Sequence, residues 1–167
     1  MPNNRSRRPV PAANPKPYEP TEDQLQGPPK KFAYELWMFR EALRFFLHPA
    51  PRNEALHNIC LEATLLHARN LLDFFTGKPP LKDDIRAAHF LPQSVRTEQG
   101  NWWTSSKLAQ LQKRERDINK SLSHLTYTRV DEKPVWDDLA QIGEEIEAAY
   151  REFRELLPDK DRVAWPA

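Results

Sequence analysis

The stretch LLHARNLLDFF, residues 65–75, decides the fold because apolar side chains recur on two faces of the helix that it predicts. At about 100° per residue, one face of the segment 53–75 holds Leu61, Leu65, Ala68, Leu72 and Phe75. The opposite face holds Ile59, Ala63, Leu66 and Phe74. A helix that is apolar on two sides is expected at the centre of a helical protein, with neighbours on both sides. Asn53 is a suitable N-cap, and TGKPP at 76–80 ends the helix after Phe75.

Further amphipathic segments flank this helix. In 32–47, apolar residues are spaced three and four apart and stop before PAP at 49–51. A short helix is predicted around 85–90, with Asp83 or Asp84 as its cap. A third long helix is expected to start at Ser105 or Ser106, and a fourth covers 139–156. We therefore expect an all-α fold, a helical bundle of four main helices plus a short helix.

The first 30 residues differ from the rest in composition. They hold eight of the sixteen prolines and almost no aliphatic side chains, so burial cannot offset the entropy lost on ordering. We expect a disordered proline-rich arm at 1–30. We favour a solvated tail for RSRR at 5–8, and the alternative is that these residues contact RNA or act as an address. One helical bundle domain is expected at 31–160.

Charge and cysteine content exclude several classes of function. The chain has 25 Lys and Arg against 24 Asp and Glu, so nothing in its overall charge favours nucleic acid or membranes. A single cysteine, Cys60, excludes an intrachain disulfide and a cysteine metal cluster. With no run of 18 apolar residues and no cleavable signal, we predict a cytoplasmic protein that binds no membrane. Charge is uneven locally, because 107–129 is mostly basic and 136–157 mostly acidic, which favours packing of the third helix against the fourth.

Several polar side chains of the second and third helices are expected to face the bundle. His67 and Asn70 point into the apolar sector, and Arg69 can pair with Asp73 one turn further on. Because an unpartnered buried polar group costs roughly 1–3 kcal/mol, such groups either cross-link the bundle or line a site. We favour a structural network, with Asn119 of the third helix as the partner of Arg69 and Asn70. Its predicted members are His67, Arg69, Asn70, Asp73, Asn119 and Arg129. No metal site is predicted, since His67 lacks further ligands at suitable spacing.

The outer face of the third helix carries different chemistry. His124 shares a sector with Arg116, Asp117, Lys120 and Ser121. A titratable imidazole among cations and hydroxyls is suited to handling a phosphodiester. The alternative interpretation of the same residues is an ordinary solvated face.

HARNLLDFF at 67–75 and INKSLSHLTYTR at 118–129 resemble a family of uncharacterised bacterial helical proteins, and the bundle resembles a divergent member of the HEPN superfamily. The resemblance covers roughly 32–157. It implies a dimer in which an Arg and a His of each subunit meet in one cleft, where RNA is cleaved without metal or cofactor. By this resemblance Arg116 would hold the phosphate and His124 would shuttle the proton.

The spacing of this pair departs from the HEPN pattern. Seven residues separate Arg116 from His124, one more than the four to six of the pattern. On a continuous helix the two would lie about 12 Å apart along the axis and about 80° apart around it. They would cooperate only across a dimer, or if the helix breaks near HLTYTR. Arg52 and His57 have the family's spacing. However, they open the second helix, whereas the family carries its motif on a later helix.

Two functions remain open. The favoured one is a HEPN-like bundle of bacterial type with a structural or interaction role, linked to toxin–antitoxin or phage-defence systems. The alternative is a metal-independent ribonuclease acting as a dimer. The partners expected under these hypotheses are a second copy, RNA, and an antitoxin or other protein. A metal-dependent hydrolase is not supported, because no pair of His and carboxylate ligands stands at helical spacing with a third in view.

Overall fold

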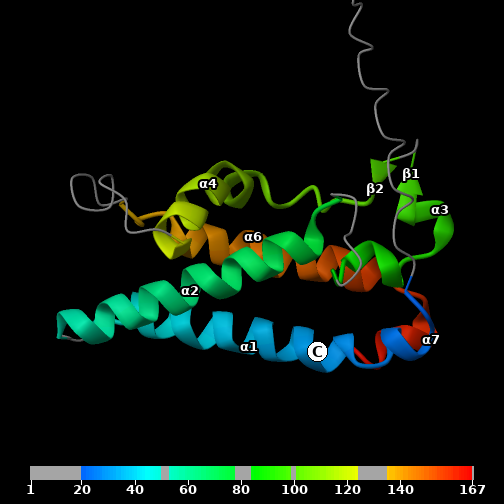
Figure 1. The fold of residues 1–167 in the computed structure, drawn as a ribbon, viewed down its shortest axis with the longest axis horizontal. Helices are drawn as coiled ribbons and strands as arrows, with labels where there is room; N and C mark the ends of the chain where they lie inside the picture. Colours follow the sequence, from blue (N-terminus) through cyan, green and yellow to red (C-terminus); the bar gives the residue numbers. More distant parts are fainter. Residues whose placement is uncertain (1–19, 50–52, 78–83, 99–100, 124–134, 167) are drawn as a thin grey trace, which may run out of the picture.

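The computed structural model describes residues 20–49, 53–77, 84–98, 101–123 and 135–166. Its four long helices are α1 (Pro28–Leu47), α2 (Glu54–Phe75), α4 (Ala109–Ser123) and α6 (Leu139–Leu156) (Figure 1). The short elements are η1 (Asp23–Leu25), η2 (Ala87–Phe90), α3 (Gln93–Arg96), α7 (Asp159–Arg162) and an antiparallel pair of strands, β1 (Thr97–Glu98) and β2 (Asn101–Trp102). The predicted all-α bundle of four main helices is confirmed. Among the described residues, no helix is long and apolar enough to cross a membrane.

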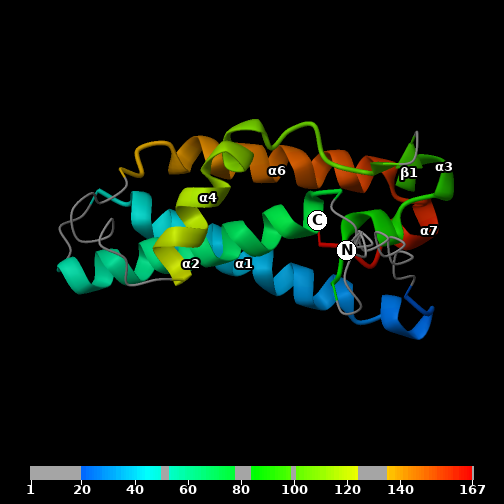
Figure 2. The ribbon, with the colours of Figure 1, turned by 45° about the horizontal axis from the view of Figure 1, so that its top comes forward.

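α2 is the central helix of the bundle. It runs antiparallel to α1 and also contacts α4 and α6, while α4 lies against both α2 and α6 (Figure 2). The packing of basic α4 on acidic α6 confirms the expectation from their charges. Only one of the two apolar faces predicted for α2 is covered along its whole length, because Ile59 and Leu66 on the other face are 62% and 44% exposed.

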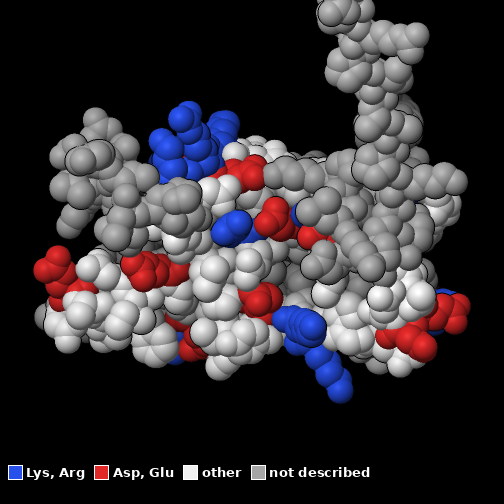
Figure 3. Space-filling model, in the orientation of Figure 1, with Lys and Arg blue, Asp and Glu red and all other residues white. Residues whose placement is uncertain are grey.

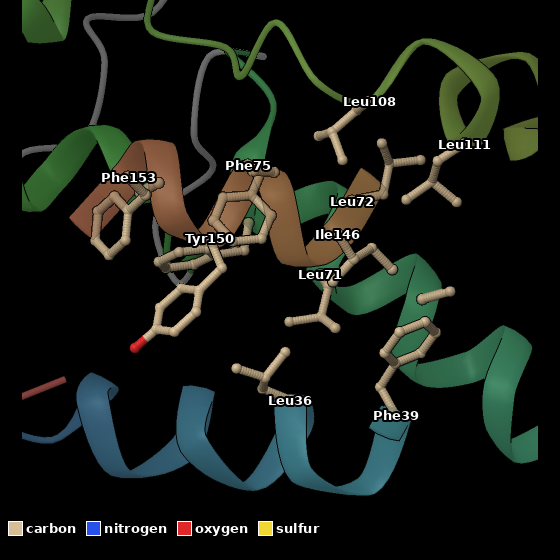
Figure 4. Close-up of a cluster of buried hydrophobic side chains, with 14 of the residues drawn as sticks. Leu36, Phe39, Leu71, Leu72, Phe75, Leu108, Leu111, Ile146, Tyr150 and Phe153 are labelled. Atoms are coloured by element: carbon tan, nitrogen blue, oxygen red, sulfur yellow. The ribbon is translucent and has the colours of Figure 1, made fainter. Parts of the chain in front are cut away.

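The core follows the three- and four-residue spacing of apolar side chains in the long helices. Figure 4 shows its main members: Leu36, Phe39, Leu71, Leu72, Phe75, Leu108, Leu111, Ile146, Tyr150 and Phe153. Near one end, Trp165 packs edge-on against Phe153 with ring centroids 4.7 Å apart and is only 4% exposed. The packed chain therefore extends past residue 160.

The N-terminal boundary of the bundle also differs from the expectation. α1 begins at Pro28, and Pro28 and Pro29 are both buried, so the last part of the segment assigned to a disordered arm is helical. Proline is tolerated there because the first turn of a helix needs no backbone N–H donor. Residues 1–19 lie outside the described residues.

The starts of α2 and α4 are set in different ways. Asn53 caps α2 as predicted, its side chain accepting a 2.7 Å hydrogen bond from the Leu56 amide. α4 begins at Ala109 rather than at either predicted serine, and its exposed amides are met by a carboxylate of α6. Glu145 accepts hydrogen bonds from the amides of Gln110 and Leu111 at 3.0 Å each.

The predicted short helix is present as η2, but its cap is different. Asp84 does not cap it, because Arg86 occupies the N-cap position. Asp84 instead accepts a 2.7 Å hydrogen bond from the guanidinium of Arg86, which is itself buried.

α1 and α6 approach closely where α6 carries a glycine. A Cβ on Gly143 would lie 2.6 Å from a methyl carbon of Leu43, so the glycine leaves room for the α1 side chain. One turn further along α6, Glu147 pairs with Arg40 of α1 at 2.6 Å, and this hydrogen bond raises the pKa of Arg40. The next turn carries Tyr150, whose pKa burial raises to about 12 and whose hydroxyl donates to the Pro166 carbonyl at 2.6 Å.

Candidate functional site

The outward side of α4 carries three cations on one line. Lys113, Arg116 and Lys120 are three and four residues apart, which places them within about 60° of arc and about 10 Å along the helix axis. Lys113 and Arg116 are exposed and Lys120 is half-buried. Figure 3 shows blue side chains gathered over α4. We call these three residues the α4 stripe.

Within the described part of the chain, no residue of the α4 stripe makes an ion pair or a side-chain hydrogen bond. Arg114 of the same helix shows the contrast. It pairs with Asp117 at 3.0 Å and with Asp138 at 3.2 Å, and its guanidinium lies 4.3 Å from the ring centroid of Trp136. Arg114 therefore holds the segment before α6, whereas no described residue engages the charges of the α4 stripe.

The structure describes only one of the two proposed catalytic residues, so their relative position is not given. Arg116 is described, but His124 lies outside the described residues, as do Arg129 and Arg52. His57, the other member of the second candidate pair, is exposed and has its ring 4.6 Å from that of Phe46. Neither Arg–His pair is thus tested by this geometry.

Two polar side chains of α2, His67 and Asn70, turn toward α1. His67 is 7% exposed, and its Nδ1 lies 2.7 Å from a carboxylate oxygen of Glu35. Asn70 Nδ2 donates to the same oxygen at 3.0 Å, and the ring of Tyr34 meets the His67 ring edge-on, with centroids 6.1 Å apart. We call Glu35, His67 and Asn70 the Glu35 cluster. It links α1 to α2, because both α2 residues lie on the side of that helix that faces α1.

The expectation that Asn119 is the partner of Asn70 was therefore wrong. The sequence held a signal for the actual partner, since Glu35 stands three residues after Phe32 and four before Phe39, at the spacing of the α1 seam. A carboxylate at that spacing is expected to face a neighbouring helix and to require a donor there.

The other predicted members of the polar network do not join this cluster. Asp73 pairs with Arg86 at 3.7 Å rather than with Arg69, and the Arg86 guanidinium also donates to the Asp73 carbonyl. Arg69 makes no ion pair with another described residue. Oδ1 of Asn119 is buried and has no hydrogen-bond partner among the described residues. Arg86 is 8% exposed and was missed, because it lies in a segment without clear periodicity.

A hollow of about 250 Å³ at the end of α6 is lined by Arg151, Arg154, Glu155 and Arg162. Arg162 is already engaged there, since it donates to the carbonyls of Arg154, Glu155 and Leu157 and pairs with Asp159. Its guanidinium thus caps the end of α6. Among the described residues, no group of three or more His, Cys, Asp or Glu side chains could hold a metal ion.

Comparison with known proteins found no match: no family model, no curated protein and no solved structure matches this chain. The functional interpretation accordingly rests on the residues of the chain itself. Of these, the α4 stripe has the clearest unused chemistry, because three cations lie on one line and no described residue pairs with them, whereas Arg86, Arg114 and Arg162 are engaged inside the fold.

Proposed function

We propose that this protein is a HEPN-like bundle that works by interaction rather than catalysis and that binds the backbone of RNA through the α4 stripe. The observation that carries the proposal is a line of three cations on the outer side of α4, Lys113, Arg116 and Lys120, with which no described residue pairs. The resemblance of 67–75 and 118–129 to HEPN proteins supports RNA as the polyanion and a role in toxin–antitoxin or phage-defence systems.

The charge of the whole molecule does not supply the attraction, because the formal net charge is only +1. A local stripe can still act, since screened charges interact over about 8–10 Å in physiological salt, which is the length of the stripe. Exposed Lys and Arg side chains that contact phosphates position a nucleic acid but do not read its sequence. We expect weak, sequence-independent binding that falls steeply with salt.

Fluorescence anisotropy with a labelled single-stranded RNA tests the proposal. If three phosphates are neutralised, the logarithm of the association constant falls with the logarithm of salt concentration with a slope of about −2. The triple variant Lys113→Gln, Arg116→Gln, Lys120→Gln should bind at least about tenfold more weakly at low salt and lose most of that slope.

A second triple variant, Lys30→Gln, Lys31→Gln, Lys160→Gln, is the matched control, because it removes the same charge from exposed positions away from α4. It should retain most of the affinity. Equal losses in the two triple variants would show that net charge, not the α4 stripe, binds RNA.

The alternative function is metal-independent cleavage of RNA by a dimer, with His124 as proton shuttle and Arg116 as phosphate clamp. It is favoured by one observation, that Arg116 is exposed and engaged by no described carboxylate, so that it is free to hold a phosphate. Cleavage would require a proton donor and acceptor near neutral pH, which a histidine provides.

Incubating purified protein with RNA in the presence of EDTA separates the two functions. If the protein is a ribonuclease, His124→Ala abolishes cleavage while RNA binding and the circular dichroism spectrum are unchanged. Arg116→Ala should weaken both binding and cleavage. Wild-type protein that binds RNA without cleaving it supports the interaction role, and cleavage that persists in His124→Ala excludes the catalytic assignment.

A further inference from the structure

The hollow at the end of α6 is a second place where cations gather. It has a volume of about 250 Å³, and three of its four lining residues are arginines: Arg151, Arg154 and Arg162, with Glu155 as the fourth. We call it the arginine hollow. It is separate from the α4 stripe, because α4 meets α6 through Glu145, which precedes all four lining residues.

Two of the three arginines are engaged by no described residue. Within the described part of the chain, Arg151 and Arg154 form no ion pair and donate no side-chain hydrogen bond. The Nε atom of Arg154 is also buried. Because a guanidinium N–H that is withdrawn from water requires an acceptor, this donor needs a partner that the described chain does not supply.

Arg162 completes the hollow and is held in place by the end of α6. It donates hydrogen bonds to the carbonyls of Arg154, Glu155 and Leu157, and it pairs with Asp159 at 3.3 Å. The last carbonyls of a helix carry partial negative charge, which would repel an anion. Since Arg162 neutralises these carbonyls, the end of α6 does not oppose a negative ligand.

Glu155 decides how much charge such a ligand has to carry. It stands one turn after Arg151 on α6, where two side chains are neighbours on the helix surface, yet the two form no ion pair. A ligand carboxylate has the same single charge as Glu155 and gains little by competing with it. A phosphate group carries a charge of about −1.5 to −2 at neutral pH and has three acceptor oxygens, so it competes better.

The shape of the site agrees with this choice. Guanidinium groups match the oxygens of a phosphate with two parallel hydrogen bonds, which ammonium groups cannot do. Pockets that enclose whole organic ligands have volumes of roughly 300–1,000 Å³, and the arginine hollow, at about 250 Å³, is smaller. It therefore has room for the phosphate group itself, while the rest of a larger ligand would remain outside.

We propose that the arginine hollow binds a phosphate group, with Arg151 and Arg154 as its ligands and Arg162 as the fixed cation beside them. The group is either the free ion or the end of a phosphate monoester. Glu155 opposes binding and limits the affinity. This site acts independently of the α4 stripe, so the inference does not rest on RNA binding.

Amide NMR titration of the full chain at constant ionic strength tests the proposal, with inorganic phosphate and a ribonucleoside 5′-monophosphate as the two titrants. At least one titrant should cause saturable shifts centred on residues 151–162, and the unphosphorylated ribonucleoside should cause none there. Tighter binding of the monophosphate identifies an ester as the ligand, whereas equal or tighter binding of inorganic phosphate identifies the free ion.

Substitutions in the lining should change the affinity in opposite directions. Arg151→Gln and Arg154→Gln should each weaken binding about tenfold or more, because each removes a charged hydrogen-bond donor. Arg151 is exposed, so its replacement should leave the helical circular dichroism spectrum intact. Glu155→Gln should strengthen binding severalfold, since a negative charge close to the phosphate is lost. A hollow with only a structural role would not show that gain.

Arg44→Gln is the matched control for Arg151→Gln, because it removes one positive charge from an exposed position on α1. Leu43 beside it contacts Gly143, which lies about 12 Å before Arg151 along the axis of α6. This variant should bind phosphate as the wild type does. Four results would overturn the proposal: no saturable shifts at 151–162 with either titrant, unchanged affinity in both arginine variants, equal losses in Arg44→Gln and Arg151→Gln, or no gain in Glu155→Gln.

Discussion

At the scale of single residues, the Glu35 cluster gives the buried His67 of α2 a hydrogen-bond partner on α1. Its carboxylate accepts hydrogen bonds from both His67 and Asn70. We predict that Glu35→Ala lowers the free energy of unfolding by about 1–3 kcal/mol, because it leaves the buried His67 nitrogen without its partner. Asn70→Ala should cost less, since Asn70 is exposed and water can replace it as a ligand of Glu35. Denaturant titration measures both.

Glu41 provides the comparison for Glu35 on the same helix. It pairs with Arg44 at 2.6 Å on the surface of α1, where solvent screens the charges and such pairs contribute little to stability. Glu41→Ala should therefore be nearly neutral. If Glu35→Ala is equally neutral, the cluster does not stabilise the contact between α1 and α2.

At the scale of elements, Glu145 connects the start of α4 to α6. Its carboxylate meets the amides of Gln110 and Leu111, which have no partner within their own helix. Because a charged acceptor at a helix N-terminus also complements the helix dipole, we predict that Glu145→Gln lowers stability by about 1 kcal/mol. Amide hydrogen exchange in the first turn of α4 should become faster than in the wild-type protein, while exchange in α6 should change less.

The neighbouring Glu144 is the control for this substitution, because it is exposed on α6 and forms no hydrogen bond or ion pair with a described residue. Glu144→Gln should leave exchange in α4 unchanged. If both substitutions speed exchange in α4 equally, the cause is the lost negative charge and not the lost cap. Since α4 carries the α4 stripe, a frayed first turn should also weaken RNA binding slightly.

The two helix starts show why some features could be predicted from the sequence and others could not. Asn53 caps α2 from the adjacent position, so a local pattern was sufficient. The acceptor for α4 comes from Glu145, about 35 residues further along the chain, and no local signal in 105–111 identifies it. The Glu35 cluster was missed for a related reason, because the choice between Glu35 and Asn119 as partner depends on which helix lies beside His67. Periodicity identifies an inward face but not the neighbour that it meets.

At the scale of the whole molecule, the same limit applies to surfaces. The pattern of α2 predicted two apolar faces correctly, yet one of them is covered mainly at its C-terminal end, where Phe74 is buried while Ile59 and Leu66 are not. A monomer sequence cannot distinguish apolar residues buried inside the chain from those buried between chains. The basic character of 107–129 was likewise visible in the sequence. The structure was needed to separate Arg114, which is paired, from Arg116, which pairs with no described residue.

The last prediction concerns how much of the N-terminus the bundle requires. Pro28, Pro29 and Phe32 are buried in the first turns of α1, and the Phe32 ring contacts that of Trp165 with centroids 5.3 Å apart. Residues 1–19 are rich in proline and poor in apolar side chains, so their composition gives them little to contribute to a core. We predict that removing 1–19 changes the midpoint of thermal unfolding by no more than about 2 °C.

Removing 1–30 should lower this midpoint by several degrees, because burial of two prolines and the first turn of α1 is lost. Differential scanning calorimetry compares the three proteins at one concentration, which also keeps any dimer contribution constant. A large loss on removing 1–19 alone would show that the proline-rich segment packs on the bundle.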